Sequence, residues 1–104
     1  MGAKTRELIN VLNQIETLLQ EDKQNHWLKL ISSANKSIKN SDYSGIETLL
    51  SYFGGMGSFN DLIIGQTQKN GKFEWKKNDR ENNDKLHELR LAAYELSIYI
   101  SHHH

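Results

Sequence analysis

The stretch YFGGMGSFNDLIIG, residues 52–65, separates the helical segments of the first half of the chain from the second half. It holds three of the seven glycines of the chain within four positions. Gly54 or Gly55 stands where an apolar repeat stops, and this predicts the left-handed residue that ends a helix. Gly57 then allows a sharp turn, and Ser58 is predicted to cap the turn after it. The stretch therefore predicts a helix stop, a corner and a new start, in that order.

The segment before this corner, residues 44–53, has the pattern of a short helix. Ser44 and Glu47 have the spacing of a capping box, in which the hydroxyl accepts a backbone hydrogen bond while the carboxylate reaches back to the first amide. The apolar residues of this helix lie three and four positions apart and form its predicted buried stripe: Ile46, Leu49, Leu50 and Phe53.

Two more helices are predicted nearer the N-terminus, because apolar residues recur there at the spacing of one helix face. Thr5 is the predicted N-cap of the first helix, and a start one or two residues earlier is the alternative. A polar break at residues 20–25 separates it from the second, and we expect an antiparallel helical hairpin. The first repeat is Leu8, Val11, Leu12, Ile15, Leu18 and Leu19, and the second is Trp27, Leu30, Ile31, Ala34 and Ile38.

After the corner, residues 62–77 have the pattern of a β-hairpin. The dipeptide Asn70-Gly71 is typical of a hairpin turn. Phe73 and Trp75 alternate with charged residues, and we expect both aromatic side chains to pack against the helices, since an isolated hairpin is barely stable. A disordered loop is the alternative. The lysines of this segment are interpreted as protection of a strand edge, in preference to a site for single-stranded nucleic acid.

The last segment, residues 78–101, is predicted to be the longest helix, capped by Asn78 or Asp79. Leu91, Tyr94 and Ile98 widen its apolar surface, so that it is either the central core helix or the contact of a homodimer. The predicted fold class is all-α: an irregular four-helix bundle with a short β-hairpin or ordered loop before the last helix. The main apolar repeat of this helix is Leu86, Leu89, Ala93, Leu96 and Ile100.

Composition restricts the classes of function. The 104 residues suffice for a single domain, expected over residues 1–101, and the final histidines at 102–104 are interpreted as the remnant of a purification tag. Thirteen basic residues balance thirteen acidic ones, so no nucleic-acid partner is expected. The chain has no cysteine and no apolar segment long enough to cross a membrane, and we expect a cytoplasmic protein without membrane contact.

Recognisable catalytic and cofactor motifs are missing. Phosphate-binding loops place glycines after a strand and before a helix, whereas the glycines here follow a helix. Outside the terminal run the chain has two histidines, His26 and His87, without the spacing of metal ligands. No nucleophile elbow is present. We therefore expect no enzyme activity, no cofactor and no metal site.

The corner nevertheless carries the candidate binding residues. Met56 and Phe59 are expected to point inward and to anchor it. Asn60 and Asp61 exceed what capping requires and are candidates for contact with a partner. Arg90, in the apolar repeat of the last helix, is expected to hydrogen-bond loop carbonyls near the corner or to pair with Asp61. The candidate binding residues are Gly55, Met56, Gly57, Ser58, Phe59, Asn60, Asp61 and Arg90.

Three stretches carry a resemblance to a known family: HW at 26–27, FGGMGSFNDL at 53–62 and LHELRLAAYELS at 86–97. Together they resemble a family of small bacterial proteins that are classed as a domain of unknown function. The resemblance implies a bacterial origin and transfers no catalytic residue. The expected function is a protein-interaction module, immunity-like or regulatory, with an unidentified protein partner that contacts Phe59, Asn60, Asp61 and the adjoining loop. The alternative is a small-ligand or anion-binding protein that uses the backbone amides of residues 54–61.

Overall fold

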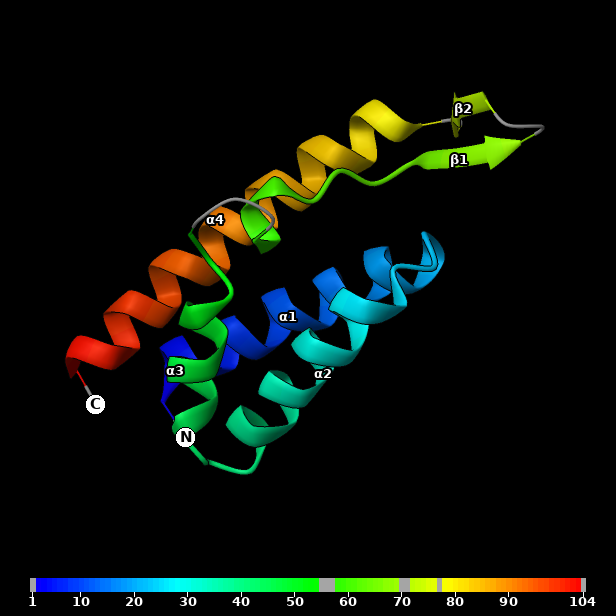
Figure 1. Cartoon of the computed structure of the whole chain (residues 1–104). Coiled ribbons are helices and arrows are strands. Elements are labelled where there is room, and N and C mark those ends of the chain that lie inside the picture. Colours follow the sequence, from blue (N-terminus) through cyan, green and yellow to red (C-terminus); the bar gives the residue numbers. More distant parts are fainter. Residues whose placement is uncertain (1, 55–57, 70–71, 77, 104) are drawn as a thin grey trace.

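The computed structural model describes residues 2–54, 58–69, 72–76 and 78–103. Within these ranges the fold is all-α with one short β-hairpin, as the sequence predicts (Figure 1). The elements in chain order are α1 (Ala3–Glu21), α2 (Asn25–Lys39), α3 (Ser44–Ser51), the 3₁₀ turn η1 (Phe59–Asp61), β1 (Gln66–Lys69), β2 (Lys72–Trp75) and α4 (Asp79–His103).

The four helices form an elongated bundle, and the chain as a whole measures 49 × 22 × 20 Å. Helices α1 and α2 form the predicted antiparallel hairpin, and α1 also packs along α4 (Figure 1). The short α3 contacts both α2 and α4 and so closes the bundle. The β-hairpin extends past the first turn of α4 (Figure 1). Helix α4 therefore connects the hairpin end of the molecule to the end where both chain termini lie (Figure 1).

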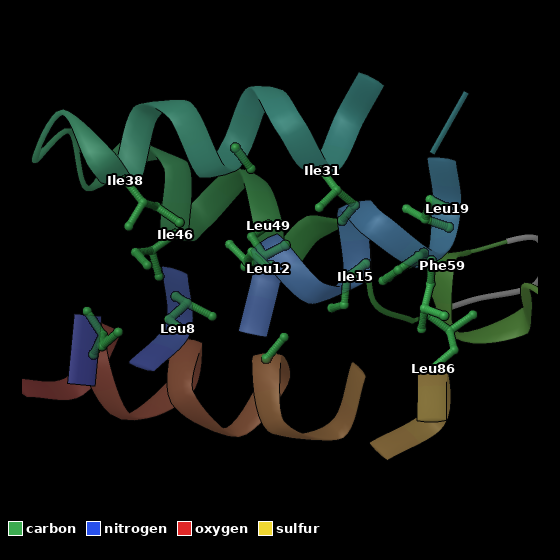
Figure 2. Packing of buried hydrophobic residues seen from close by; sticks show 14 of the residues in the cluster. Leu8, Leu12, Ile15, Leu19, Ile31, Ile38, Ile46, Leu49, Phe59 and Leu86 are labelled. Atoms are coloured by element: carbon green, nitrogen blue, oxygen red, sulfur yellow. The ribbon is translucent and has the colours of Figure 1, made fainter. Parts of the chain in front are cut away.

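The buried core follows the predicted apolar repeats of all four helices (Figure 2). Leu89 and Leu96 of α4 are half-buried at its edge, and so are Leu50 and Phe53 of α3 and its C-terminal end. Helix α4 is thus a core helix within this chain. The buried apolar side chains are Leu8, Leu12, Ile15, Leu18, Leu19, Ile31, Ala34, Ile38, Ile46, Leu49, Phe59, Ile64, Leu86, Ala93 and Ile100.

Two predicted helix caps are wrong. Helix α1 begins at Ala3 with Gly2 at the N-cap, so Thr5 lies inside the first turn, where its side chain is buried. Helix α3 begins at Ser44 without a capping box. Asp42 holds this start instead: its Oδ1 accepts hydrogen bonds from the backbone N–H of Ser44 (3.1 Å) and from its Oγ (2.7 Å). In both cases the helix begins one or more residues earlier than the predicted cap requires.

The predicted helix stop and the predicted start of the last helix are confirmed. Gly54 follows the end of α3 with φ +108°, a conformation that favours glycine. Gly55 and Gly57 lie outside the described residues. The carbonyl of Asn78 accepts a hydrogen bond from the Asn82 N–H (3.0 Å), and this bond opens the first turn of α4.

The segment before α4 is a β-hairpin, with Gln66 paired to Trp75 and Lys69 paired to Lys72. The Asn70-Gly71 turn and the side chain of Phe73 lie outside the described part of the structure. Trp75 is 55% exposed, so the expectation that it packs against the helices is wrong. The physical reason is the position of the hairpin, which extends past the start of α4 (Figure 1).

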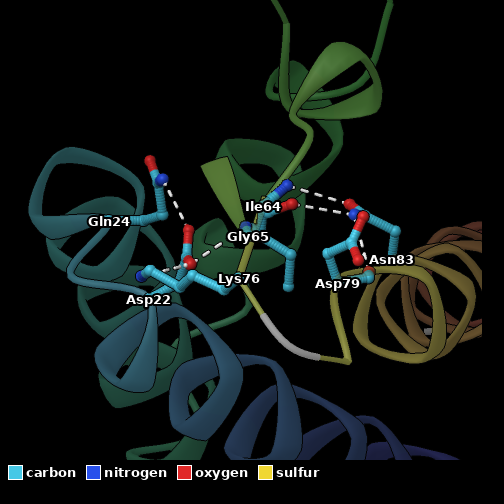
Figure 3. A network of polar contacts seen from close by, with 7 residues as sticks. All are labelled: Asp22, Gln24, Ile64, Gly65, Lys76, Asp79 and Asn83. Atoms are coloured by element: carbon cyan, nitrogen blue, oxygen red, sulfur yellow. Dashed lines mark hydrogen bonds and ion pairs between the residues drawn. The ribbon is translucent and has the colours of Figure 1, made fainter. Parts of the chain in front are cut away.

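Two polar side chains fix the base of the hairpin (Figure 3). Asp22, after α1, accepts hydrogen bonds from the Gly65 N–H (2.9 Å), Lys76 Nζ (2.8 Å) and Gln24 Nε2 (2.8 Å). Asn83 of α4 accepts from the Ile64 N–H (2.8 Å) and donates to the carbonyl oxygen of the same residue (2.8 Å). The chain between η1 and β1 is therefore tied both to α1 and to α4.

We expect the Asp22 contacts to make stability depend on pH. Burial raises the pKa of Asp22, whereas hydrogen bonds from Lys76, Gln24 and the Gly65 amide lower it. Together the hydrogen bonds have the larger effect, so the pKa of Asp22 lies below its usual value. The carboxylate therefore stabilises the fold above the unfolded pKa of about 3.9, and this contribution is lost as the pH falls through the lower folded pKa. Asp22→Asn should cost about 1–2 kcal/mol of unfolding free energy at pH 7.

Urea unfolding from pH 7 down to pH 3 measures this effect, because the Asp22→Asn variant should lose less stability on acidification than the wild type does. Asp84→Asn, at an exposed position of α4, is the matched control, with an expected change within about 0.5 kcal/mol. Equal acid sensitivity of the wild type and the Asp22 variant would contradict the assigned role.

Candidate functional site

The corner after α3 is held against α4 by Arg90. Its Nη1 donates hydrogen bonds to the carbonyl oxygens of Phe59 (2.7 Å) and Leu62 (2.8 Å), one in η1 and one directly after it. The predicted role of Arg90, bonding to loop carbonyls near the corner, is confirmed. On the other side of η1, the Phe59 N–H donates to the carbonyl of Tyr52 (2.9 Å). The backbone of η1 is therefore fixed to both flanking helical segments.

Phe59 anchors the corner in the core. Its side chain is fully buried, at the end of the core where Leu19 and Leu86 also lie (Figure 2). The inward direction predicted for Phe59 is confirmed, and its use as part of an exposed contact surface is therefore ruled out. Met56, the second predicted anchor, lies outside the described residues.

Aromatic rings surround Phe59 and connect the helices. Its ring centroid lies 5.1 Å from Trp27 of α2 and 5.8 Å from Phe53, and the Arg90 guanidinium lies 5.8 Å from its centre. Phe53 in turn meets the ring of Tyr94 on α4 edge-on at 5.4 Å. The three sequence stretches that carry the family resemblance thus converge at this corner.

Burial and a nearby carboxylate act in opposite directions on Arg90. The residue is 9% exposed, and burial lowers the pKa of its guanidinium, while the negative charge of Asp61 raises it. A guanidinium nevertheless remains protonated in proteins. The site therefore contains a largely buried positive charge, which the two carbonyl dipoles and Asp61 compensate in part.

A small cavity, flanked by exposed side chains, lies on the outer side of the corner between η1 and α4. The cavity has a volume of about 140 Å³ and is lined by Asn60 of η1 and by His87, Arg90, Leu91 and Tyr94 of α4. Asn60 and Asp61 are exposed, as expected of residues available for contact. Leu91 is 51% exposed and Tyr94 is 42% exposed. Two half-exposed apolar side chains therefore border a cavity that the buried Arg90 also lines.

His87 was not among the residues predicted for this site. His87, Arg90, Leu91 and Tyr94 are spaced i, i+3, i+4 and i+7 and so share one face of α4. That spacing was visible in the sequence, but only the return of η1 onto this face shows that Asn60 lies beside it.

The predicted cap by Ser58 is wrong. No side-chain hydrogen bond caps η1, and the buried Oγ of Ser58 has no hydrogen-bond partner within the described part of the chain. The turn is closed by backbone contacts instead: the Asp61 N–H donates to the Ser58 carbonyl (3.0 Å). Of the other candidate binding residues, Gly55, Met56 and Gly57 lie outside the described ranges. The proposed anion site at their backbone amides therefore also lies outside the described part of the structure.

Larger hollows lie elsewhere on the bundle. One of about 500 Å³ runs between α1 and α4 and includes Val11, Leu96 and Tyr99, and one of about 600 Å³ near the chain ends includes Tyr99 and His103. In the part of the chain that the structure describes, no three His, Asp or Glu side chains gather in a way that could hold a metal ion. The described helices are each too short or too polar to cross a lipid bilayer.

The model of one protein family, described as a domain of unknown function (DUF6966), matches residues 20–72. The chain belongs to this family. Neither the curated proteins nor the solved structures include a match. The matched range contains α2, α3, η1 and β1, and Trp27, Phe53 and Phe59 of the corner lie within it. Arg90 and the rest of α4 lie beyond the matched residues.

Proposed function

We propose that this chain is a protein-interaction module whose contact surface is the outer side of the corner. This surface, called the corner surface, consists of Asn60, Asp61, His87, Leu91 and Tyr94. One observation carries the proposal: two large apolar side chains of α4 stay about half exposed beside a cavity that contains a buried arginine. Exposed apolar groups gathered around a pocket and bordered by polar groups are typical of partner-binding sites.

The size and support of the cavity favour a protein partner over a small molecule. Pockets for cofactors and metabolites generally measure about 300–1,000 Å³. The corner cavity, at about 140 Å³, has room for one anchoring side chain. Arg90 and the buried Phe59 hold the surrounding backbone, so that a partner would meet a surface already in its binding geometry.

The larger hollows support a second candidate, the binding of a small ligand. Their volumes of about 500 and 600 Å³ lie within the range of ligand pockets. The hollow near the chain ends is lined in part by His103, which belongs to the terminal histidine run that we interpret as a tag remnant. Ligand binding would therefore use the C-terminal part of α4, whereas the sequence predicted a ligand site at the corner, residues 54–61.

The finer parts of the proposal concern the setting. We propose a bacterial cytoplasmic protein with an immunity-like or regulatory role, supported by the lack of cysteine and by the resemblance of the three corner stretches to small bacterial proteins. Balanced charge supports a protein partner over nucleic acid. In a homodimer, the partner at the exposed face of α4 would be a second copy of this chain.

Affinity capture from the native host tests this proposal. Three baits are used in parallel: the wild type, a Leu91→Ser/Tyr94→Ser variant and a Tyr99→Ser control. Tyr99 also lies on α4 and is 45% exposed, close to the 42% of Tyr94, but it lines the α1–α4 hollows. We expect a protein that the wild type and the control retain and the double variant loses. Retention of every captured protein by the double variant would refute the corner surface.

Light scattering on the purified wild type separates a second copy of the chain from a different partner. A dimer that the Leu91→Ser/Tyr94→Ser variant converts to a monomer would identify the partner as the chain itself. A monomeric wild type would exclude the homodimer.

A further inference from the structure

Most of the residues that line the corner cavity carry a side-chain hydrogen-bond donor. The lining residues with polar side chains are Asn60, His87, Arg90 and Tyr94. The residues that line it include no carboxylate, and Asp61 is exposed next to the cavity without lining it. An amide, an imidazole and a guanidinium can all donate a hydrogen bond, and the guanidinium adds a permanent positive charge.

Arg90 has donor capacity that the fold does not use. A guanidinium carries five N–H groups. In the part of the chain that the structure describes, its two hydrogen bonds both start at Nη1 and end at Phe59 and Leu62. Within those described residues, Nε–H and the two Nη2–H groups make no further hydrogen bond. Such a fork can bind a carboxylate, or a phosphate, through two parallel hydrogen bonds.

We infer that the corner cavity binds the side-chain carboxylate of a glutamate on the partner protein, an inference that rests on the proposed interaction function. Arg90 supplies the charge and the paired donors, and Asn60 and His87 supply further donors to the carboxylate oxygens. Leu91 and Tyr94 contact the methylene groups of the glutamate and exclude water from the ion pair. A free inorganic anion would make no use of this apolar rim, which is why we assign the site to a side chain.

Binding of a carboxylate would also complete the charge balance at Arg90. Buried charges in proteins are paired or hydrogen-bonded, since an isolated one is costly to remove from water. The guanidinium here is 9% exposed and receives partial compensation from Asp61. An acidic partner residue would then be a central anchor, and partners with glutamine at this position should be discriminated against.

Nuclear magnetic resonance titration of the full chain with capped glutamate, N-acetyl-glutamate amide, tests the inference. Capped glutamine and inorganic phosphate serve as comparison probes, and the observed signals are the Arg90 Nε–H and the Asn60 side-chain amide. We expect saturable shifts with capped glutamate, with a dissociation constant on the order of millimolar and about tenfold weaker binding of capped glutamine. An equal response to the two capped residues, or a response to phosphate alone, would overturn the inference.

A charge variant keeps the test independent of the structural role of Arg90. Asn60→Asp places a carboxylate at the cavity without removing Arg90 and should weaken capped-glutamate binding at least tenfold. Asn10→Asp adds the same charge at an exposed position of α1 and should leave binding unchanged. Unchanged binding by the Asn60→Asp variant would count against the site.

The capture experiment distinguishes failure of this inference from failure of the proposed function. Loss of the captured protein on Leu91→Ser/Tyr94→Ser, combined with no response to capped glutamate, would overturn the carboxylate site while the interaction surface stands. Saturable binding of capped glutamate, combined with retention of every captured protein by the double variant, would refute the interaction surface while supporting the cavity as a carboxylate site.

Discussion

Phe59→Ala is expected to lower the free energy of unfolding by about 3–5 kcal/mol, the usual cost of deleting a fully buried aromatic side chain. The ring is fully buried and contacts Trp27 and Phe53, so its removal leaves a cavity where α2, the end of α3 and α4 meet. For a domain of this size the loss is a large part of the total stability of about 5–15 kcal/mol.

Urea unfolding followed by circular dichroism measures this effect. Trp75→Ala is the control, since it also deletes a large aromatic ring but at a 55% exposed position on the hairpin. Its expected change is within about 0.5 kcal/mol. Similar losses from the two variants would contradict the assignment of Phe59 as the anchor of the corner.

Arg90→Ala should cost about 2–4 kcal/mol, because the carbonyl oxygens of Phe59 and Leu62 lose a charged donor. Arg90→Lys should recover only part of this loss, since one ammonium on a flexible stem replaces a planar fork poorly. The η1 turn should then separate from α4, and the fluorescence of Trp27, which packs against Phe59, should change before global unfolding.

Thermal and urea unfolding of both Arg90 variants, with Trp27 fluorescence recorded in a Trp75→Phe background, measure these effects. Arg80→Ala removes an arginine from the first turn of α4, away from the corner, and is the matched control, with little expected change. An Arg90→Ala variant as stable as the wild type would show that the two carbonyl contacts do not hold the corner.

Periodicity allowed most of the fold to be predicted. The apolar repeats identify the helices, because a helix must bury one continuous face whatever its neighbours are. Arg90 was predictable for a related reason: a guanidinium within an apolar repeat needs acceptors, and the nearest unpaired carbonyls belong to a loop. Gly54 was predictable because few other residues adopt a positive φ without strain.

The predictions that failed depend on contacts that sequence spacing does not specify. The caps at Thr5 and Ser44 were wrong because apolar spacing does not specify the residue at which a helix begins. Helix α1 begins after Gly2 without a side-chain cap, and Asp42 accepts the hydrogen bond at the start of α3. The expected packing of Trp75 was wrong because alternation identifies a strand but not what covers its faces.

Other features of the candidate site and its support lay beyond sequence reasoning for the same reason. Asp22 and Asn83 are ordinary polar residues in the sequence, and only the folded chain brings them to the hairpin base (Figure 3). His87 joins Asn60 at one cavity only because η1 returns onto α4.

The central claim is that a protein partner contacts the corner surface, and photo-crosslinking in the native host tests it most directly. A photoreactive phenylalanine analogue is placed at position 94 in one strain and at position 99 in another, two tyrosine sites on α4 with similar exposure. We predict a protein crosslink from position 94 and none from position 99. Crosslinks from position 99 alone, or none from position 94, would contradict the claim.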